Sequence, residues 1–295
     1  MTAIDTSVSA PKAPVPFDPG NWGKIVDVPT IKKVHIPVQG PITWRPMPHD
    51  MLIDMIEQTF NAQGFTYSEP VHYLAPARPH KSIPDLGQHG RFLSMYGLAH
   101  PLLPTIEGLS WELGAMNALD MSTSVKLGAG DRIAVCSNGM FSAEFMVRRK
   151  HTVGIDRDRD AHFEQIRMLV VDCISKILEK ANRRAEQIRV FQRQECTDSD
   201  ARYVIIEAAK TGVIGAAATM KVLKHWEDPE HPEFKDRNVW SLQNAFTSND
   251  RGRNLFTQPD RFQQLSGIMN QRFGFNAVER TLKDADFAVS DASEF

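Results

Sequence analysis

The stretch RIAVCSNGMFSAEFMVRRKHT, residues 132–152, predicts the centre of the fold. Two apolar runs flank Asn138-Gly139, and an Asn-Gly pair between such runs is the strongest short signal for a two-residue turn that joins antiparallel strands. The second run ends in the basic residues Arg148, Arg149, Lys150 and His151. We therefore expect a central hairpin that carries a cluster of positive charge where its second strand ends.

Strand patterns precede this hairpin and helix patterns follow it. Aromatic and β-branched residues bounded by Pro or Gly predict strands within residues 65–76, 90–100 and 109–119. Apolar residues at helical spacing predict helices over residues 48–64, 159–190, 197–210, 213–226, 239–246 and 259–273. This segregated order indicates an α+β fold, in which an antiparallel-rich sheet is packed by helices and the C-terminal half is helical.

The composition changes along the chain and divides it into four parts. Residues 1–45 are rich in proline, which predicts an extended arm with one edge strand near residues 31–38. Residues 46–156 form the predicted α+β core with the hairpin, and residues 157–280 form a mainly helical part packed on that core. Residues 281–295 are an acidic tail.

Charge and cysteine content limit the classes of function. The 295 residues include 34 Lys and Arg against 36 Asp and Glu, and this balance argues against a chain that binds polyanions over its whole surface. The 3 cysteines include no Cys-x-x-Cys pair, so we expect neither a disulfide framework nor a structural zinc site. Because the sequence has no signal-peptide pattern and no apolar run of about 20 residues, we expect a cytoplasmic protein with no membrane partner.

Several common site motifs do not occur in the sequence. The spacing of His72, His80, His89 and His100 matches no metal-ligand motif, and there is no phosphate-binding loop, dinucleotide fingerprint or Gly-x-Ser-x-Gly elbow. Cys136 lies in an apolar run, far along the hairpin from the basic residues, so we interpret it as an inert core thiol. We expect no metal and no cofactor.

The region from 145 to 193 gives the strongest indication of a polyanionic partner. It holds twelve Lys and Arg against seven Asp and Glu, in a chain whose net charge is −2. Cationic side chains that contact phosphates supply most sequence-independent affinity for nucleic acid. The candidate contacts are Arg148, Arg149, Lys150, His151, Arg157, Lys180, Arg183 and Arg184. The alternative interpretation is a solvated helix face with ion pairs four residues apart, and the composition does not separate the two.

Four short motifs, taken in order, resemble those of the phage/plasmid-like protein family, a domain of unknown function. The matching residues are Asn117, Asp120 and Ser122, then Val135, Cys136 and Asn138, then Lys150, His151 and Thr152, and finally Trp240, Asn244 and Ala245. The resemblance covers residues 65–250, most of the chain. The chain departs from the family pattern at Met116, Ala118, Met121 and Ser137, which replace Arg, Ser, Lys and Asp.

The resemblance implies a protein of phages, plasmids or integrated elements in a bacterial host, with a connection to DNA metabolism. We therefore expect a protein that binds single-stranded nucleic acid through a basic patch, acts in DNA annealing or recombination, and forms homo-oligomers. Two alternatives stay open, an enzyme acting on a nucleotide or nucleic acid, and a structural or host-interaction protein. For the enzyme, the catalytic candidates are Asp120 and His151, which converge with Asn138 and Lys150 if their strands are neighbours.

Overall fold

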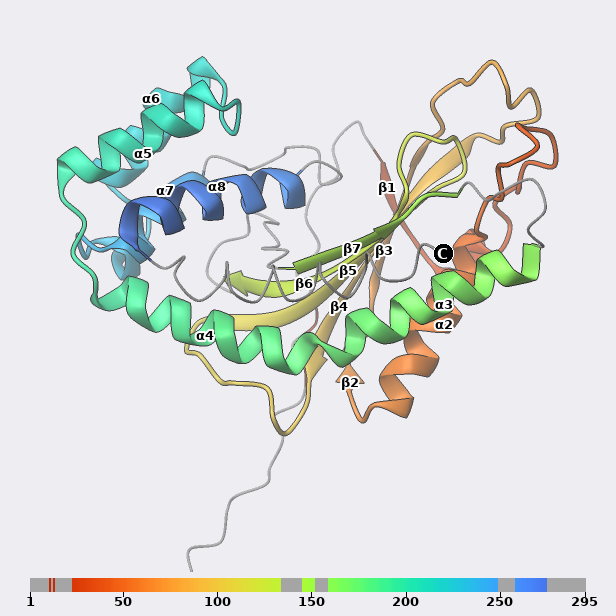
Figure 1. Ribbon diagram of the computed structural model, residues 1–295, viewed down its shortest axis with the longest axis horizontal. Helices are drawn as coiled ribbons and strands as arrows, with labels where there is room; N and C mark the ends of the chain where they lie inside the picture. Colours follow the sequence, from red (N-terminus) through yellow and green to blue (C-terminus); the bar gives the residue numbers. More distant parts are fainter. Residues whose placement is uncertain are drawn as a thin grey trace, which may run out of the picture. The chain divides into compact units, whose positions relative to one another are not determined.

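A computed structural model describes Pro11, Ala13 and residues 23–133, 145–151, 159–248 and 258–274 (Figure 1). Its main element is a 7-stranded antiparallel sheet with the order β1-β3-β4-β5-β6-β7, and β2 pairs with β4 off this path. The strands are β1 (Lys24–Val26), β2 (Thr66–Tyr67), β3 (Val71–Pro76), β4 (His89–Ala99), β5 (Leu109–Ala118), β6 (Val125–Ile133) and β7 (Phe145–Arg149). The predicted α+β fold is confirmed. β6 and β7 pair antiparallel, and the Asn138-Gly139 turn between them lies outside the described residues.

Helices follow the sheet along the chain and also precede it. They are α1 (Val28–Ile31), α2 (His49–Ala62), α3 (Arg159–Ser175), α4 (Ile177–Arg193), α5 (Asp198–Lys210), α6 (Ala216–Glu227), α7 (Val239–Ser248) and α8 (Gln258–Phe273), with a short 3₁₀ turn η2 (Pro232–Phe234). The single helix predicted over 159–190 is instead two helices that meet at Lys176. The edge strand expected near 31–38 is wrong, because β1 occupies that role and α1 reaches Ile31. None of the described helices is long and apolar enough to cross a lipid bilayer.

The strand register decides which side chains face the helices. Trp111 of β5 lies opposite Asp131 of β6, and Leu113 lies opposite Ala129. Since successive side chains of a strand point to opposite faces, the odd-numbered residues of β5, β6 and β7 share one face of the sheet. That face carries the main core, where Leu113 and Leu127 pack with Phe60 of α2 and with the apolar side of α3. Figure 1 shows α2, α3 and α4 on this same side of the sheet.

The described residues form two compact units. One lies within Met1–Ala185 and Arg251–Pro259, and the other within Glu186–Asp250 and Asp260–Phe295. The division falls inside α4, whereas the composition places the start of the helical part at residue 157. The helix α3 and the first half of α4 group with the sheet because their apolar side chains complete its core.

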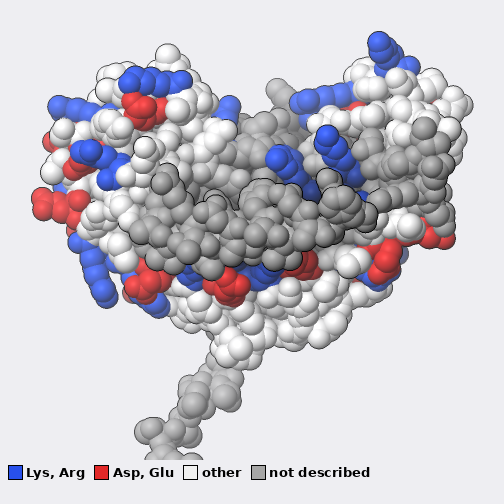
Figure 2. All heavy atoms as spheres, viewed as in Figure 1, with Lys and Arg blue, Asp and Glu red and all other residues white. Residues whose placement is uncertain are grey.

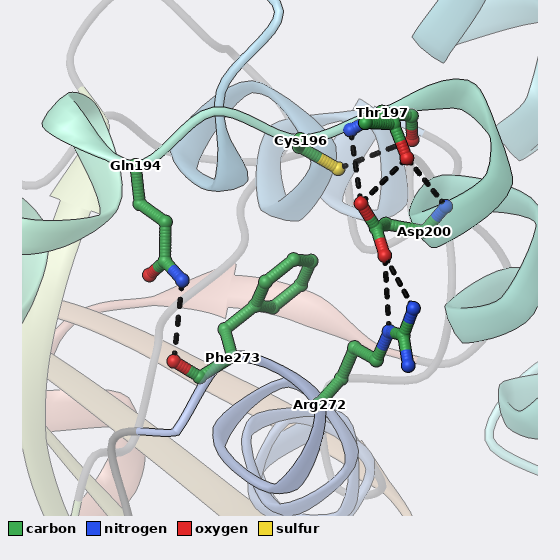
Figure 3. A network of polar contacts seen from close by, with 6 residues as sticks. All are labelled: Gln194, Cys196, Thr197, Asp200, Arg272 and Phe273. Atoms are coloured by element: carbon green, nitrogen blue, oxygen red, sulfur yellow. Dashed lines mark hydrogen bonds and ion pairs between the residues drawn. The ribbon is translucent and has the colours of Figure 1, made fainter.

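A polar network ties α5 to α8 in the second unit (Figure 3). Thr197 and Asp200 form the capping box expected from their spacing, with the Thr197 hydroxyl accepting from the Asp200 amide at 3.2 Å. A carboxylate oxygen of Asp200 accepts from Nε of Arg272 at 3.1 Å. Gln194 donates to the carbonyl of Phe273 at 3.2 Å. Asp200 and Gln194 therefore both bind the C-terminal end of α8.

We expect Thr197→Ala to lower the free energy of unfolding by about 1 kcal/mol, because an N-cap hydroxyl satisfies a backbone donor of the first turn. The hydrogen bond from Thr197 and the contact with Arg272 lower the pKa of Asp200. The ionised Asp200 side chain therefore stabilises the fold above its unfolded pKa, about 4, and this contribution is lost as the pH falls through the folded pKa. Urea unfolding at several pH values measures both effects. Ser199→Ala, in the same exposed first turn, is the control, and an equal loss in the control would contradict the assignment.

Candidate functional site

Residues from separate stretches of the sequence meet at one end of the sheet. Asn117 lies near the end of β5, Asp120 follows that strand, and His151 follows β7. All three are buried, and Asp120 is close enough to influence the pKa of His151. Asn117, Asp120 and His151 therefore lie at the same end of the sheet.

The Asp120 carboxylate holds the turn after β5. One oxygen accepts from the amide of Arg78 at 2.6 Å, and the other accepts from the amide of Ser122 at 2.9 Å. The guanidinium of Arg91 lies 3.9 Å away. Between Asp120 and Ser122, Met121 has a φ of 60°, a left-handed conformation that is costly for a residue with a side chain. Because both oxygens are engaged in shaping this turn, the geometry favours a positioning role for Asp120 over general base catalysis.

Asn117 fixes the protonation state of a histidine that the sequence did not single out. Its side-chain amide donates to the carbonyl of Met47 at 2.7 Å, and the same nitrogen lies 2.8 Å from Nδ1 of His49. Since that amide nitrogen can only donate, Nδ1 of His49 accepts and the proton of the neutral ring lies on Nε2. Burial lowers the pKa of His49 to about 3, with a smaller effect from His151, so the ring is neutral at physiological pH. The ring also stacks on Phe92, with centroids 5.0 Å apart.

Two further imidazoles belong to the same region, since His151 influences the pKa of His49 and His162 influences the pKa of His151. Burial lowers the pKa of His151 to about 4, and His162 in the first turn of α3 contributes to that shift. Burial also lowers the pKa of His162, followed by the charges of Arg149 and Arg45. The amide of Arg45 donates to the carbonyl of His151 at 2.7 Å. A neutral ring only 4% exposed is poorly placed to take a proton from a surface substrate, which disfavours His151 as a general base.

We call the buried groups at this end of the sheet the inner polar cluster. It consists of His49, Asn117, His151 and His162, together with the half-buried guanidinium groups of Arg45 and Arg149. Among the described residues, no group of three His, Cys, Asp or Glu side chains is arranged to hold a metal ion.

Strand alternation separates Arg148 and Arg149. Arg149 lies opposite Val125 on the face that packs against the helices, and it donates to Oε1 of Gln165 in α3. Arg148 lies opposite Lys126 and therefore shares the other face with it. Arg148 and Lys150 are exposed and Lys126 is half-buried. We call Lys126, Arg148 and Lys150 the outer basic surface.

The candidate contacts on α4 differ from what the sequence suggested. Arg184 is buried, and its Nε donates to Oδ1 of Asp131 in β6 at 2.8 Å, so assigning it to nucleic-acid binding is wrong. Lys180 and Arg183 are half-buried, and the cleft beside Lys180 has room for about one water molecule. Lys176 pairs with Asp172 at 3.0 Å, within the helical segment that follows the sheet. Figure 2 shows acidic and basic side chains mixed across the lower part of the view, where Figure 1 draws α3 and α4. These contacts favour the ion-paired helix face over a basic stripe.

A second buried ion pair lies on the opposite face of the sheet. Nη1 of Arg132 is 3.3 Å from Oε1 of Glu112, and both side chains are buried. Burial raises the pKa of Glu112 to about 7, although Arg132 acts against this shift. Since a buried charge without its partner is costly, these residues belong to the framework that holds the sheet.

The remaining candidates lie elsewhere or outside the described residues. Asn138 and Arg157, like Cys136 and Thr152, fall in the segments that the structure does not describe. Trp240 and Asn244 are buried in α7 of the second unit, where the Asn244 side chain donates to the carbonyl of Trp240 at 2.8 Å. This contact is internal to the helix and gives Asn244 a local structural role.

Sequence reasoning missed three members of the inner polar cluster, namely Arg45, His49 and His162. For His162 a signal exists, because it precedes Ile166 by four residues and so lies on the buried stripe of α3. Arg184 likewise lies between Ala181 and Ile188 at helical spacing, on the buried side of α4. His49 carries the same kind of signal, because it precedes Leu52 and Ile53 by three and four residues on the buried side of α2. Arg45 belongs to the segment before α2 and carries no periodic signal.

Comparisons with protein-family models, with curated proteins and with solved structures found no match for this chain. The resemblance to the phage/plasmid-like family therefore stays a prediction that rests on the motifs in the sequence.

The buried ion pair between Arg184 and Asp131 predicts that substitutions of two adjacent arginines have unequal effects on stability. Arg184→Ala leaves Asp131 buried without its cation and should lower the free energy of unfolding by about 3–5 kcal/mol. Arg183→Ala, one residue earlier on a less buried side of α4, should cost far less. Urea unfolding monitored by circular dichroism measures both. If Arg184→Ala is no more destabilised than Arg183→Ala, the ion pair with Asp131 is not formed in solution.

Proposed function

We propose that this chain binds single-stranded nucleic acid through the outer basic surface, as a mobile-element protein acting in annealing or recombination. The observation that carries the proposal is the placement of Lys126 directly opposite Arg148, with Lys150 exposed just beyond the strand. Among the described residues, Arg148 and Lys150 have no acidic partner within ion-pair distance. Cations that no carboxylate neutralises are available to phosphate oxygens.

The form of this surface supports a single strand over a duplex. Neighbouring strands of a sheet are about 4.8 Å apart, so cations on adjacent strands form a closely spaced row along which a flexible backbone can lie. Reading a duplex normally requires an element that enters the major groove with polar side chains at its tip. The helix α6, which follows the turn at Gly212, begins with Ala216, Ala217 and Ala218 and offers no such side chains there.

The contacts of α4 also support this choice of surface. The helix was the other candidate for a phosphate contact, but Arg184 is engaged with Asp131 and Arg189 pairs with Glu186 at 3.4 Å. By contrast, Arg148 and Lys150 at the end of β7 are exposed and have no acidic partner among the described residues. The enzyme alternative receives no comparable support. Asp120 is buried and its carboxylate accepts from backbone amides, and His151 is a buried ring whose pKa is lowered to about 4.

We expect the triple variant Lys126→Ala, Arg148→Ala, Lys150→Ala to bind a labelled single-stranded oligonucleotide more weakly at about 50 mM salt. The slope of log affinity against log salt should flatten by about 2, since each lost phosphate contact on a single strand removes about 0.7. Fluorescence anisotropy at several salt concentrations measures both quantities.

The matched control removes three charges that pair with acids of their own helices, Arg167→Ala, Lys176→Ala and Arg189→Ala. The control should retain the affinity and the salt slope of the parent chain. If the parent chain does not bind at low salt, or if both variants weaken binding equally, the outer basic surface is not the binding site.

We also infer that copies of the chain assemble when they bind. Within the described residues, β1 and β7 each pair on one side only, and an edge strand presents backbone groups that a second chain can pair with. Light scattering after size exclusion, with and without single-stranded DNA, should show a mass above that of one chain in the presence of DNA. A mass of one chain per strand under both conditions would contradict assembly.

A further inference from the structure

The inner polar cluster contains more buried polar atoms without a hydrogen-bond partner than a packed protein core usually does. Within the described part of the chain, these buried atoms have no hydrogen-bond partner: Nε2 of His49, both ring nitrogens of His151 and of His162, Oδ1 of Asn117 and Nε of Arg149. The three imidazoles are each 4% exposed or less. Each buried polar group without a partner is destabilising, so this accumulation points to a polar occupant.

The charge around the cluster is positive. The Arg45 guanidinium donates to the carbonyls of Ile42 at 2.7 Å and of Trp44 at 2.9 Å, and Arg149 donates to the neutral side chain of Gln165. Neither guanidinium has a carboxylate partner among the described residues. The acid next to His151 is Asp120, which already accepts from two amides and has Arg91 beside it.

Two helices begin at the cluster, which adds to this positive potential. α2, of 14 residues, starts at His49, and its N-cap Pro48 provides no side-chain acceptor. α3, of 17 residues, carries His162 in its first turn. A helix N-terminus bears about half a positive charge and a set of amide donors without intrahelical partners. The helix ends, the arginines and the unpartnered imidazoles all favour the same kind of occupant, which is an anion.

We propose that the inner polar cluster binds a phosphate-class oxyanion, held by Arg45 and Arg149 and by the ring N–H groups of His151, His162 and His49. A tetrahedral oxyanion has enough acceptor sites to meet several donors that converge from different directions. The Nε2–H of His49, whose tautomer Asn117 fixes, is one such donor. The ligand is either a free phosphate or the terminal phosphate of a nucleic-acid strand. The inference does not rest on the proposed function, because Lys126, Arg148 and Lys150 take no part in it.

Binding should be coupled to proton uptake. In the free chain, burial lowers the pKa of His151 to about 4 and also lowers the pKa of His162, which favours the neutral form of both rings. An anion beside them stabilises the imidazolium form and raises its pKa, so the complex binds more protons than the free chain. Affinity should therefore rise as the pH falls from about 8 to about 6, by up to tenfold per pH unit for each proton taken up.

The test uses the full chain labelled with ¹⁵N-histidine and titrated with sodium sulfate, whose charge is constant over this pH range. Imidazole resonances of His49, His151 and His162 should shift and saturate, and the affinity should increase on acidification. Arg45→Gln should reduce the affinity at least tenfold, whereas Arg183→Gln, a half-buried arginine on α4, should leave it unchanged. Since the wild-type chain itself provides the main readout, the test does not depend on the folding of any variant.

Competition against bound sulfate distinguishes the two sources of the ligand. Displacement by a 5′-phosphorylated oligonucleotide, but not by its 5′-hydroxyl counterpart, would support the site and identify a strand end. Displacement by inorganic phosphate alone would support the site and identify a free anion. Shifts that sodium chloride reproduces at equal ionic strength, or the absence of saturable shifts, would overturn the proposal. Neither result depends on whether the Lys126, Arg148 and Lys150 variant still binds DNA.

Discussion

The register of β5 against β6 is the constraint on which the other features depend. With Trp111 opposite Asp131, the odd-numbered residues of both strands face α2, α3 and α4. A shift of β6 by one residue would turn Leu127 away from the core and would move Asp131 away from Arg184. The ion pair and the apolar core therefore select the same register. Because β7 pairs with β6 in turn, the same register also decides which of its basic residues point outward.

Much of the fold can be predicted from the sequence, because the local periodicity of its residues agrees with their packing in the structure. The helix at 49–62, the strand at 109–118 and the capping box at Thr197 follow from periodicity and spacing alone. The break at Lys176 was missed because the apolar stripe continues through it, from Ile174 to Ile177. The small β1 strand was missed because three residues, only one of them half-buried, carry no alternating pattern.

The candidate site was less predictable, because burial of a charged residue is a tertiary property. Composition treats Arg183 and Arg184 alike, yet helical spacing puts only Arg184 on the side that meets Asp131. The motif residues Asn117, Asp120 and His151 were singled out by resemblance, and their convergence required strands that are distant in sequence to end together. The partners Arg45 and His49 come from a segment whose position depends on contacts such as that between the Arg45 amide and the His151 carbonyl.

Strand alternation gives the neighbouring basic residues at the end of β7 different environments. Read as a sequence, Arg148, Arg149 and Lys150 form one cluster, and a single role for all three is the natural interpretation. In the structure, Arg148 and Lys150 are exposed whereas Arg149 turns inward to Gln165 and influences the pKa of His162. The Arg149 guanidinium is half-buried on the face that packs against the helices, where its charge has no acidic partner among the described residues. Since a charge removed from water is stabilised by one of opposite sign, this side chain is one of the observations that support the proposed anion.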